Sequence, residues 1–289
     1  MSADSFRKTM FGVYLAIFMI YLFGPLLAMG ITAFNTSNYP QVVPFEGFTL
    51  QWFVKLWNHK QMMEGLQNSI IIGIGVVVIS VPVGLAASIL MNQVYSRARG
   101  LFYLVTISPL LTPGIIIGIS TVIFWKDMFG VTDFTKATFY KGMVLAILGQ
   151  CSFVSAYCML LIMARLTRFD RAQEEAALDL GASYPQVFWH ILLPYLRPAI
   201  FSAAVIAFLS SFENYNTTTF ASLADKTLVT VLAGETRQGT TPALSALAVI
   251  IISLSLLGAV VYELLKRREE QAHAAMKERA RLAERGDVV

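Results

Sequence analysis

The chain has 289 residues, of which 56% are hydrophobic and only 14% are charged. A soluble domain of this length carries about 25% charged residues, so the composition excludes an ordinary soluble enzyme and indicates an integral membrane protein. The net charge of +4 does not indicate nucleic-acid binding in so apolar a chain, because a basic bias on the cytoplasmic side of a membrane accounts for it.

Six apolar stretches are long enough to cross a hydrocarbon core, which needs about 20 residues of helix. The sequence therefore predicts an all-α membrane protein with spans near 10–34, 69–92, 100–124, 142–165, 196–216 and 243–265. The first stretch is too long for the apolar core of a cleaved signal peptide, so we expect it to remain as a span. We expect a transmembrane domain over residues 1–265 and a charged, solvated tail over residues 266–289.

Basic residues between the spans predict the orientation of the chain. With the N-terminus inside, the inner segments hold 15 Lys and Arg residues and the outer segments hold 7. This excess favours cytoplasmic N- and C-termini. On the outer side, Trp52 and Trp57 predict a short helix lying at the membrane interface.

The third span contains two prolines, Pro109 and Pro113, in the stretch "SPLLTPGIIIGIS". Proline removes a backbone donor, so we expect this helix to be kinked or broken. Interrupted helices line the substrate path in many transporters, which makes both prolines candidates for that path. An ordinary packing kink explains them equally well. In the second span, small residues favour close helix contacts at Gly73, Gly75 and Gly84.

A polar insert, "EEAALDLGASYPQVFWHILLP", lies between the fourth and fifth spans on the predicted cytoplasmic side. Asp170 suits the start of a helix over 171–180, and Gly181 suits the left-handed position that ends one. Ser183 and Gln186 form a second capping pair that opens a short helix before Pro194. The insert thus predicts two short helices joined by a glycine turn. It could dock another protein, or it could simply cover the cytoplasmic ends of the bundle.

The insert resembles the "EAA" loop of binding-protein-dependent ABC importer permeases, whose pattern is E-A-A-x3-G-x9-I-x-L-P. Glu175 to Ala177, then Gly181, then Ile191, Leu193 and Pro194 meet every position of that pattern, in a loop over about 167–195. The resemblance implies a type I ABC importer permease fold and a coupling role for the insert. The coupling residues that it implies are Glu174, Glu175, Ala176, Ala177, Asp179, Gly181, Ala182, Ile191, Leu193 and Pro194.

The same resemblance implies the partners and the cellular location. In this family a separate ATP-binding-cassette ATPase dimer binds ATP and Mg²⁺, a second permease completes the path, and an extracytoplasmic solute-binding protein delivers the solute. The second permease is expected to be a related but different chain. The location implied is the bacterial inner membrane, in which the chain would be a multi-pass protein.

The wider chain is similar to the spermidine/putrescine branch of these permeases, in "FLSSFENYNTTTFAS" and "TPALSALAVIII". That similarity implies a polyamine-like organic cation as the solute, with opine, phosphonate and other small-solute importers as alternatives. Because a carboxylate in a span usually faces a partner or a water-filled path, Glu213 and its neighbours Asn214, Tyr215 and Asn216 are candidates for the substrate path. A position at the water interface is the other interpretation of Glu213.

The motifs of an enzyme are absent from the sequence. No G-x-x-x-x-G-K-[ST] phosphate loop occurs, so the chain does not bind ATP in that way, and no cofactor is expected in this chain. The three histidines, His59, His190 and His273, are too far apart in sequence to suggest a metal site. Two other classes remain open: an ATP-independent channel or carrier, and, with less support, an intramembrane enzyme.

Overall fold

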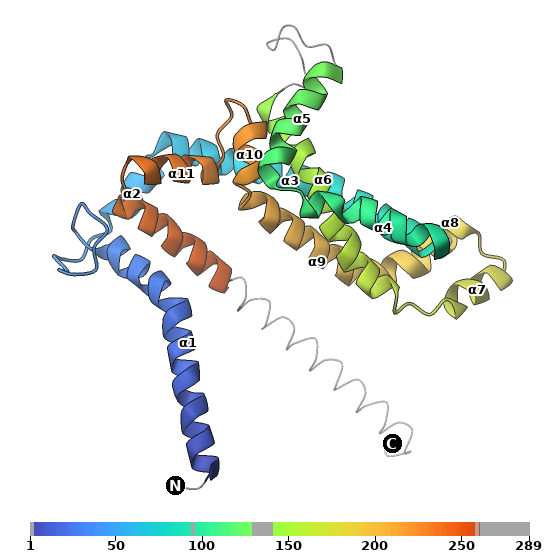
Figure 1. Cartoon of the computed structure of the whole chain (residues 1–289), viewed down its shortest axis with the longest axis horizontal. Coiled ribbons are helices and arrows are strands. Elements are labelled where there is room, and N and C mark those ends of the chain that lie inside the picture. Colours follow the sequence, from blue (N-terminus) through green and yellow to red (C-terminus); the bar gives the residue numbers. More distant parts are fainter. Residues whose placement is uncertain (1–2, 94–95, 129–140, 258–259, 261–289) are drawn as a thin grey trace, which may run out of the picture. The chain divides into compact units, whose positions relative to one another are not determined.

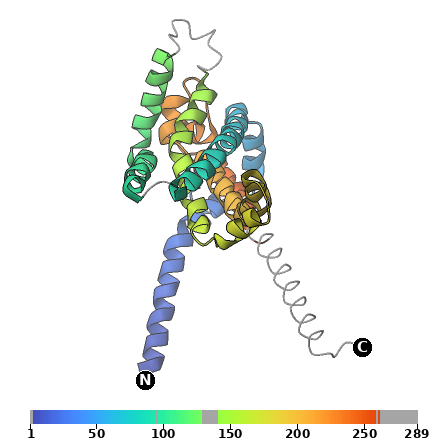
Figure 2. The same cartoon turned by 90° about the vertical axis from the view of Figure 1, so that its right-hand side faces the viewer.

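The computed structural model describes residues 3–93, 96–128, 141–257 and 260, and every structural statement below concerns these residues. They form helices and short connections, with one isolated antiparallel bridge between Asn35 and Phe48. The chain divides into two compact units, which are described separately (Figures 1 and 2). The first unit comprises Met1–Asn58 and Thr236–Val289, and the second comprises His59–Glu235.

The first unit contains α1 (Ala3–Phe34), α2 (Gln51–Trp57) and the helix Pro242–Leu257. Thr32 on α1 donates a buried hydrogen bond of 2.9 Å to Ser245. Nearly all side chains of α1 before its last turn are exposed, although most of them are apolar. An apolar helix with so little cover within its own unit needs lipid or a further protein surface around it.

The loop between α1 and α2 folds around Asn35, which is fully buried. The Asn35 amide donates to the carbonyls of Gln41 and Pro44, each at 3.1 Å. The short helix predicted here is present as α2, and its Trp52 side chain is only 4% exposed, with the indole N–H donating to the Asn35 carbonyl at 2.7 Å. Trp57, five residues later, is 76% exposed.

The second unit is built on three long helices, α3 (Lys60–Gln93), α6 (Gly142–Leu166) and α9 (Leu193–Phe212) (Figure 1). A Cβ added at Gly75 would meet Ile147 and one at Gly84 would meet Cys158, so α3 and α6 run parallel. Their glycine contacts confirm the close packing predicted for the second span. Both cysteines, Cys151 and Cys158, are free and buried in α6.

The predicted break in the third span is confirmed. The chain forms α4 (Ser96–Leu111) and α5 (Gly114–Met128), whose axes differ by 101° across the break. The break falls at Thr112 and Pro113 because a proline disfavours the helical conformation of the residue before it. The Pro113 carbonyl then accepts the Ile116 N–H at 2.9 Å, which starts the next helix.

Helix α9 ends earlier than the span predicted over 196–216, since Phe212 is its last residue. A short helix, α10 (Asn216–Ala221), follows the break, packs against α5 and α6, and precedes α11 (Leu228–Gln238). Figure 1 shows α10 and α11 at one end of the α3–α6–α9 bundle and the polar insert at the other. Figure 2 views this unit from the side on which the insert lies.

Four helical stretches of the described residues are long and apolar enough to cross a membrane: Arg7–Phe34, Lys60–Gln93, Gly142–Leu166 and Tyr184–Phe212. The bent α4–α5 pair gives a fifth when it is counted as one span. Pro242–Leu257 is apolar but shorter, and apart from Val260 the rest of the span predicted over 243–265 lies outside the described residues, as does the tail over 266–289.

Candidate functional site

The polar insert begins with α7 (Ala172–Asp179), one residue inside the predicted helix at each end. Asp170 starts this helix: its Oδ1 accepts the Ala172 N–H at 3.0 Å, and its carbonyl accepts the Gln173 N–H at 3.2 Å. Both bonds satisfy donors that a helix N-terminus leaves free.

Gly181 ends α7 as predicted, with a φ of +89°. The Gly181 N–H bonds to the Leu178 carbonyl at 2.9 Å, and the Ala182 N–H bonds to the Ala177 carbonyl at 3.0 Å. These two bonds make a Schellman motif, in which a residue without a side chain is strongly favoured at the left-handed position. The turn between the two helices of the insert therefore has a fixed geometry.

The second capping pair is also present, because the backbone N–H and the hydroxyl of Ser183 both donate to Gln186 Oε1, at 2.8 and 3.0 Å. The prediction that this second helix stops before Pro194 is wrong. Helix α8 (Tyr184–Val187) runs through a π-turn (Phe188–Leu192) directly into α9. The π-turn shifts the hydrogen-bond register, with the Leu193 N–H bonded to the Phe188 carbonyl, so the helix tolerates the missing N–H of Pro194.

The predicted coupling residues fall into two groups. Helix α7 and its turn contain no buried residue, and they carry Glu174, Glu175, Ala176, Ala177, Asp179, Gly181 and Ala182. The half-buried Ile191, Leu193 and Pro194 lie where the insert joins α9. The structure also exposes three large apolar side chains that sequence reasoning missed: Leu180 (90%), Tyr184 (78%) and Trp189 (61%). The sequence offered one signal for them, since bulky apolar residues within a polar segment often belong to a binding surface.

The predicted substrate-path residues of the fifth span lie at the break between α9 and α10. Glu213 directly follows α9 and is exposed, Asn214 and Tyr215 are half-buried, and Asn216 is exposed at the start of α10. The Asn214 carboxamide oxygen accepts the N–H groups of Thr217 and Thr218 at 3.1 and 3.2 Å. An Asn side chain that accepts backbone N–H groups in this way stabilises the start of the helix that follows it.

The break between α4 and α5 lies beside this second break. A Cβ added at Gly114, the residue after Pro113, would lie 3.1 Å from the Asn216 Cβ. The structure therefore brings Pro113 to the neighbourhood of Asn216, although the two are far apart in sequence. Pro109 precedes this break and lies inside α4.

Gln150 is a further polar residue of this region that sequence reasoning missed. It is fully buried on α6, where its side chain donates to Thr218 Oγ1 at 2.7 Å and accepts a hydrogen bond from Ser211. Ser211 lies in the last turn of α9 and Thr218 in the first turns of α10. A lone amide within an apolar span was the available signal, because such groups are costly there unless they are paired.

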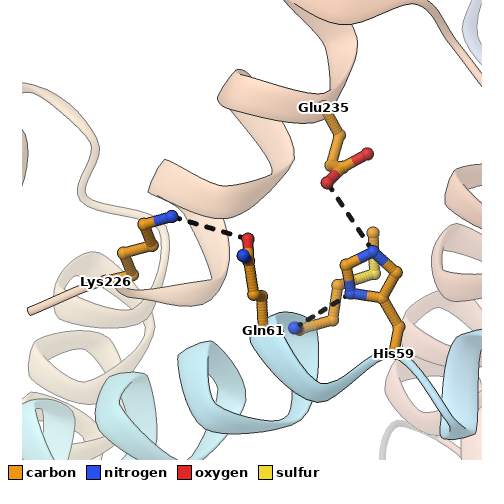
Figure 3. Close-up of polar contacts among 5 residues, drawn as sticks. His59, Gln61, Lys226 and Glu235 are labelled. Atoms are coloured by element: carbon orange, nitrogen blue, oxygen red, sulfur yellow. Dashed lines mark hydrogen bonds and ion pairs between the residues drawn. The ribbon is translucent and has the colours of Figure 1, made fainter.

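A polar cluster joins the start of α3 to α11 at the same end of the unit (Figure 3). His59 Nε2 lies 3.6 Å from Glu235 Oε1, and Lys226 Nζ lies 3.5 Å from Gln61 Oε1. Among the residues that the structure describes, no three His, Cys, Asp or Glu side chains are placed to hold a metal ion. This cluster connects helices.

Comparisons with known proteins agree with these features. Residues 80–271 match the family described as "Binding-protein-dependent transport system inner membrane component". The chain is 29% identical to the putrescine transport system permease protein PotI of Escherichia coli (strain K12) over 263 residues, covering 90% of this chain and 92% of PotI. It is also 29% identical to a spermidine/putrescine transport system permease protein PotC homolog of Mycoplasma genitalium, covering 91% and 93% of the two chains.

The fold is similar to that of a solved structure, a bacterial ABC transporter involved in the import of the acidic polysaccharide alginate. The TM-score is 0.66 at 18% identity, and the match covers 90% of this chain and 93% of the other. At that identity the likeness concerns the fold alone. Because the family match spans most of the chain and includes the whole insert, this chain belongs to the family of binding-protein-dependent transport system inner membrane components, the permease subunits of ABC importers.

Proposed function

We propose that this permease carries a polyamine-like organic cation across the bacterial inner membrane, driven by a separate ATPase. The proposed chain is a six-span, type I permease over residues 1–265, with both termini and the tail 266–289 in the cytoplasm. The excess of basic residues in the inner segments supports this orientation. ATP and Mg²⁺ would bind to the partner ATPase dimer, because this sequence has no phosphate-binding loop of its own.

The observation that carries the coupling role is the insert itself, which meets the EAA pattern and projects from the bundle. Its glycine turn holds α7 in a fixed orientation, and the exposed Leu180, Tyr184 and Trp189 offer apolar area for a partner. Buried aromatic anchors dominate the energy of most interfaces. We infer that the ATPase dimer covers these side chains, and that ATP-driven closure of the dimer moves the insert and tilts α6 and α9 between two states.

The remaining partners follow from the family. A solute-binding protein would deliver the cation, and a second, related permease would form the other half of the path. The exposed apolar surface of α1 supports a lipid or permease neighbour within the membrane.

The polyamine assignment rests on the names of the relatives and on one carboxylate. PotI is a putrescine transport permease by name, and the second relative is a spermidine/putrescine permease homolog. Glu213 is exposed at the break between α9 and α10, where a fixed negative charge can attract a cation. A pair of adjacent helix breaks, at Pro113 and at Glu213, is the kind of irregular backbone that transporters place around a solute path.

The coupling role is tested in proteoliposomes that contain the complete transporter and the binding protein. We expect Glu175→Gln and Gly181→Ala to lower putrescine uptake relative to ATP hydrolysis, Gly181→Ala because an alanine at φ +89° costs about 1–2 kcal/mol and shifts the turn. Gly100→Ala is the control, because a Cβ there meets nothing within 4 Å. Full uptake by both insert variants would contradict the coupling role, and uptake without ATPase or nucleotide would indicate a channel or carrier.

The role of Glu213 needs a test of its own. Glu213→Gln removes the charge but keeps the shape, so we expect a raised KM for putrescine with an unchanged amount of inserted permease. Glu64→Gln is the matched control, because Glu64 is also exposed and lies on α3 of the same unit. Equal kinetics in the two variants would remove Glu213 from the path.

A further inference from the structure

Arg165 and Tyr195 close the base of the insert. Arg165 is the second-last residue of α6 and Tyr195 is the third residue of α9, so the whole insert lies between them. Arg165 Nε donates to the Tyr195 carbonyl at 2.7 Å, and the guanidinium lies 4.6 Å from the centre of the Tyr195 ring. Tyr195 returns a weaker bond of 3.4 Å from its hydroxyl to the Arg165 carbonyl. Each side chain thus holds the backbone of the other helix.

Neighbouring side chains make this contact rigid. The ring of Phe169, the third residue after α6, lies 4.9 Å from the Tyr195 ring at an angle of 57°. Leu166 and Leu192 are buried in the core cluster against which Phe169 and Tyr195 pack. A half-buried guanidinium that is both hydrogen-bonded and stacked on an aromatic face is held more firmly than a solvated one.

The rest of the insert is held loosely by comparison. Helix α7 has no buried residue. Arg171, the exposed residue before it, donates a long hydrogen bond of 3.3 Å to the Asn92 carbonyl of α3. A force on α7 therefore reaches α6 and α9 through the two chain ends at the base of the insert. If those ends could slide past each other, the displacement of α7 would be absorbed there.

We propose that Arg165 is a positioning residue that fixes the ends of α6 and α9 together, so that displacement of the insert moves both helices as one body. This proposal rests on the proposed function, since it assumes that an ATPase moves the insert. It assigns Arg165 no contact with the solute. The effect of losing it is expected in the efficiency with which ATP hydrolysis drives uptake.

Arg168 provides a matched control. It lies one turn after Arg165 and lines the same groove between α6 and α9, of about 370 Å³, but its side chain is exposed. Replacing either arginine removes one positive charge from the same place on the protein. A difference between the two variants therefore reports the contact with Tyr195.

The experiment measures ATP hydrolysed per putrescine taken up, in proteoliposomes that contain the complete transporter and the binding protein. We expect Arg165→Gln to raise this ratio by about fivefold or more, the lower end of ordinary coupling factors. Arg168→Gln and Tyr195→Phe should leave it within about twofold, because Tyr195→Phe keeps both the carbonyl and the ring. An unchanged ratio in Arg165→Gln, or an equal rise in Arg168→Gln, would overturn the proposal. Wild-type vesicles without ATP-dependent uptake would instead contradict the proposed function.

A distance measurement covers the case in which Arg165→Gln does not assemble. Spin labels at the exposed positions Thr167 and Arg197, with Cys151 and Cys158 replaced by Ala, report the separation of the two helix ends in a protein that keeps Arg165. The proposal expects the same distance distribution without nucleotide and with ATP under non-hydrolysing conditions. A nucleotide-dependent change in that distance would show that the base slides and would overturn the proposal.

Discussion

The amide of Gln150 donates a hydrogen bond of 2.7 Å to the hydroxyl of Thr218, and this bond joins α6 to the helix that follows the break in the fifth span. Ser211, on the other side of the break, donates to the Gln150 oxygen, and Thr218 donates in turn to Asn214 at 3.2 Å. One buried side chain thus holds both sides of the segment that carries Glu213. Connected hydrogen bonds of this kind strengthen one another in a low-dielectric interior.

Replacing Gln150 with leucine should therefore weaken the attachment of α9 and α10 to α6. The change leaves the Ser211 hydroxyl without its acceptor and the Thr218 hydroxyl without the hydrogen bond that it accepts, at a cost of about 1–3 kcal/mol. We expect a lower Tm of the purified permease complex and a raised KM for putrescine, because the orientation of Glu213 depends on the same segment. Thermal unfolding in detergent and initial uptake rates measure the two effects.

Ser152→Ala is the control for that variant. Ser152 lies on the same helix, but it is exposed and its hydroxyl bonds at 2.7 Å to the Gly149 carbonyl of its own helix. Its loss should change neither Tm nor KM appreciably. If Gln150→Leu behaved like Ser152→Ala, the amide would have no part in holding the break.

Gly84 on α3 offers a second prediction about packing. A Cβ at this position would overlap the Cys158 Cβ and would lie 2.8 Å from the Met159 backbone nitrogen, so α3 and α6 would have to separate. Gly84→Ala should destabilise the permease by about 1–3 kcal/mol, the usual cost of overpacking. Gly100→Ala, with open space around the added methyl group, should leave the Tm equal or slightly higher. Equal Tm values for the two variants would contradict the close contact.

Features governed by local chemistry could be predicted from the sequence. Apolar length predicted the long helices, the prolines predicted the break between α4 and α5, and a glycine directly after the helix over 171–180 predicted the left-handed turn at Gly181. Each of these depends only on residues that are contiguous in the sequence.

Three other features could not be predicted in this way, two of them because they depend on residues distant in the sequence. The path of the helix through Pro194 depends on a π-turn, which no proline rule anticipates. The burial of Trp52 depends on the fold of the preceding loop around Asn35. The role of Gln150 depends on Thr218, which lies 68 residues later in the sequence.

His59 gives the last prediction, at the start of α3. Its Nδ1 accepts the Met62 N–H at 3.3 Å, which makes the imidazole an N-cap, and this leaves the proton of a neutral ring on Nε2, facing Glu235 at 3.6 Å (Figure 3). His59→Ala removes the cap and should cost about 1 kcal/mol, whereas His59→Asn keeps a cap acceptor and should recover most of that loss. Glu235→Gln should cost less than about 1 kcal/mol, because the pair is partly exposed and screened by solvent.

Thermal unfolding of the three variants separates the two contacts of the ring. If the cap dominates, His59→Asn remains close to wild type although its link to Glu235 is lost. If His59→Asn instead has as low a Tm as His59→Ala, and Glu235→Gln lowers the Tm equally, the link between α3 and α11 is the important contact. The partial exposure of both side chains, 36% for His59 and 29% for Glu235, favours the cap, because a backbone hydrogen bond at a helix start is less weakened by salt than an exposed ion pair.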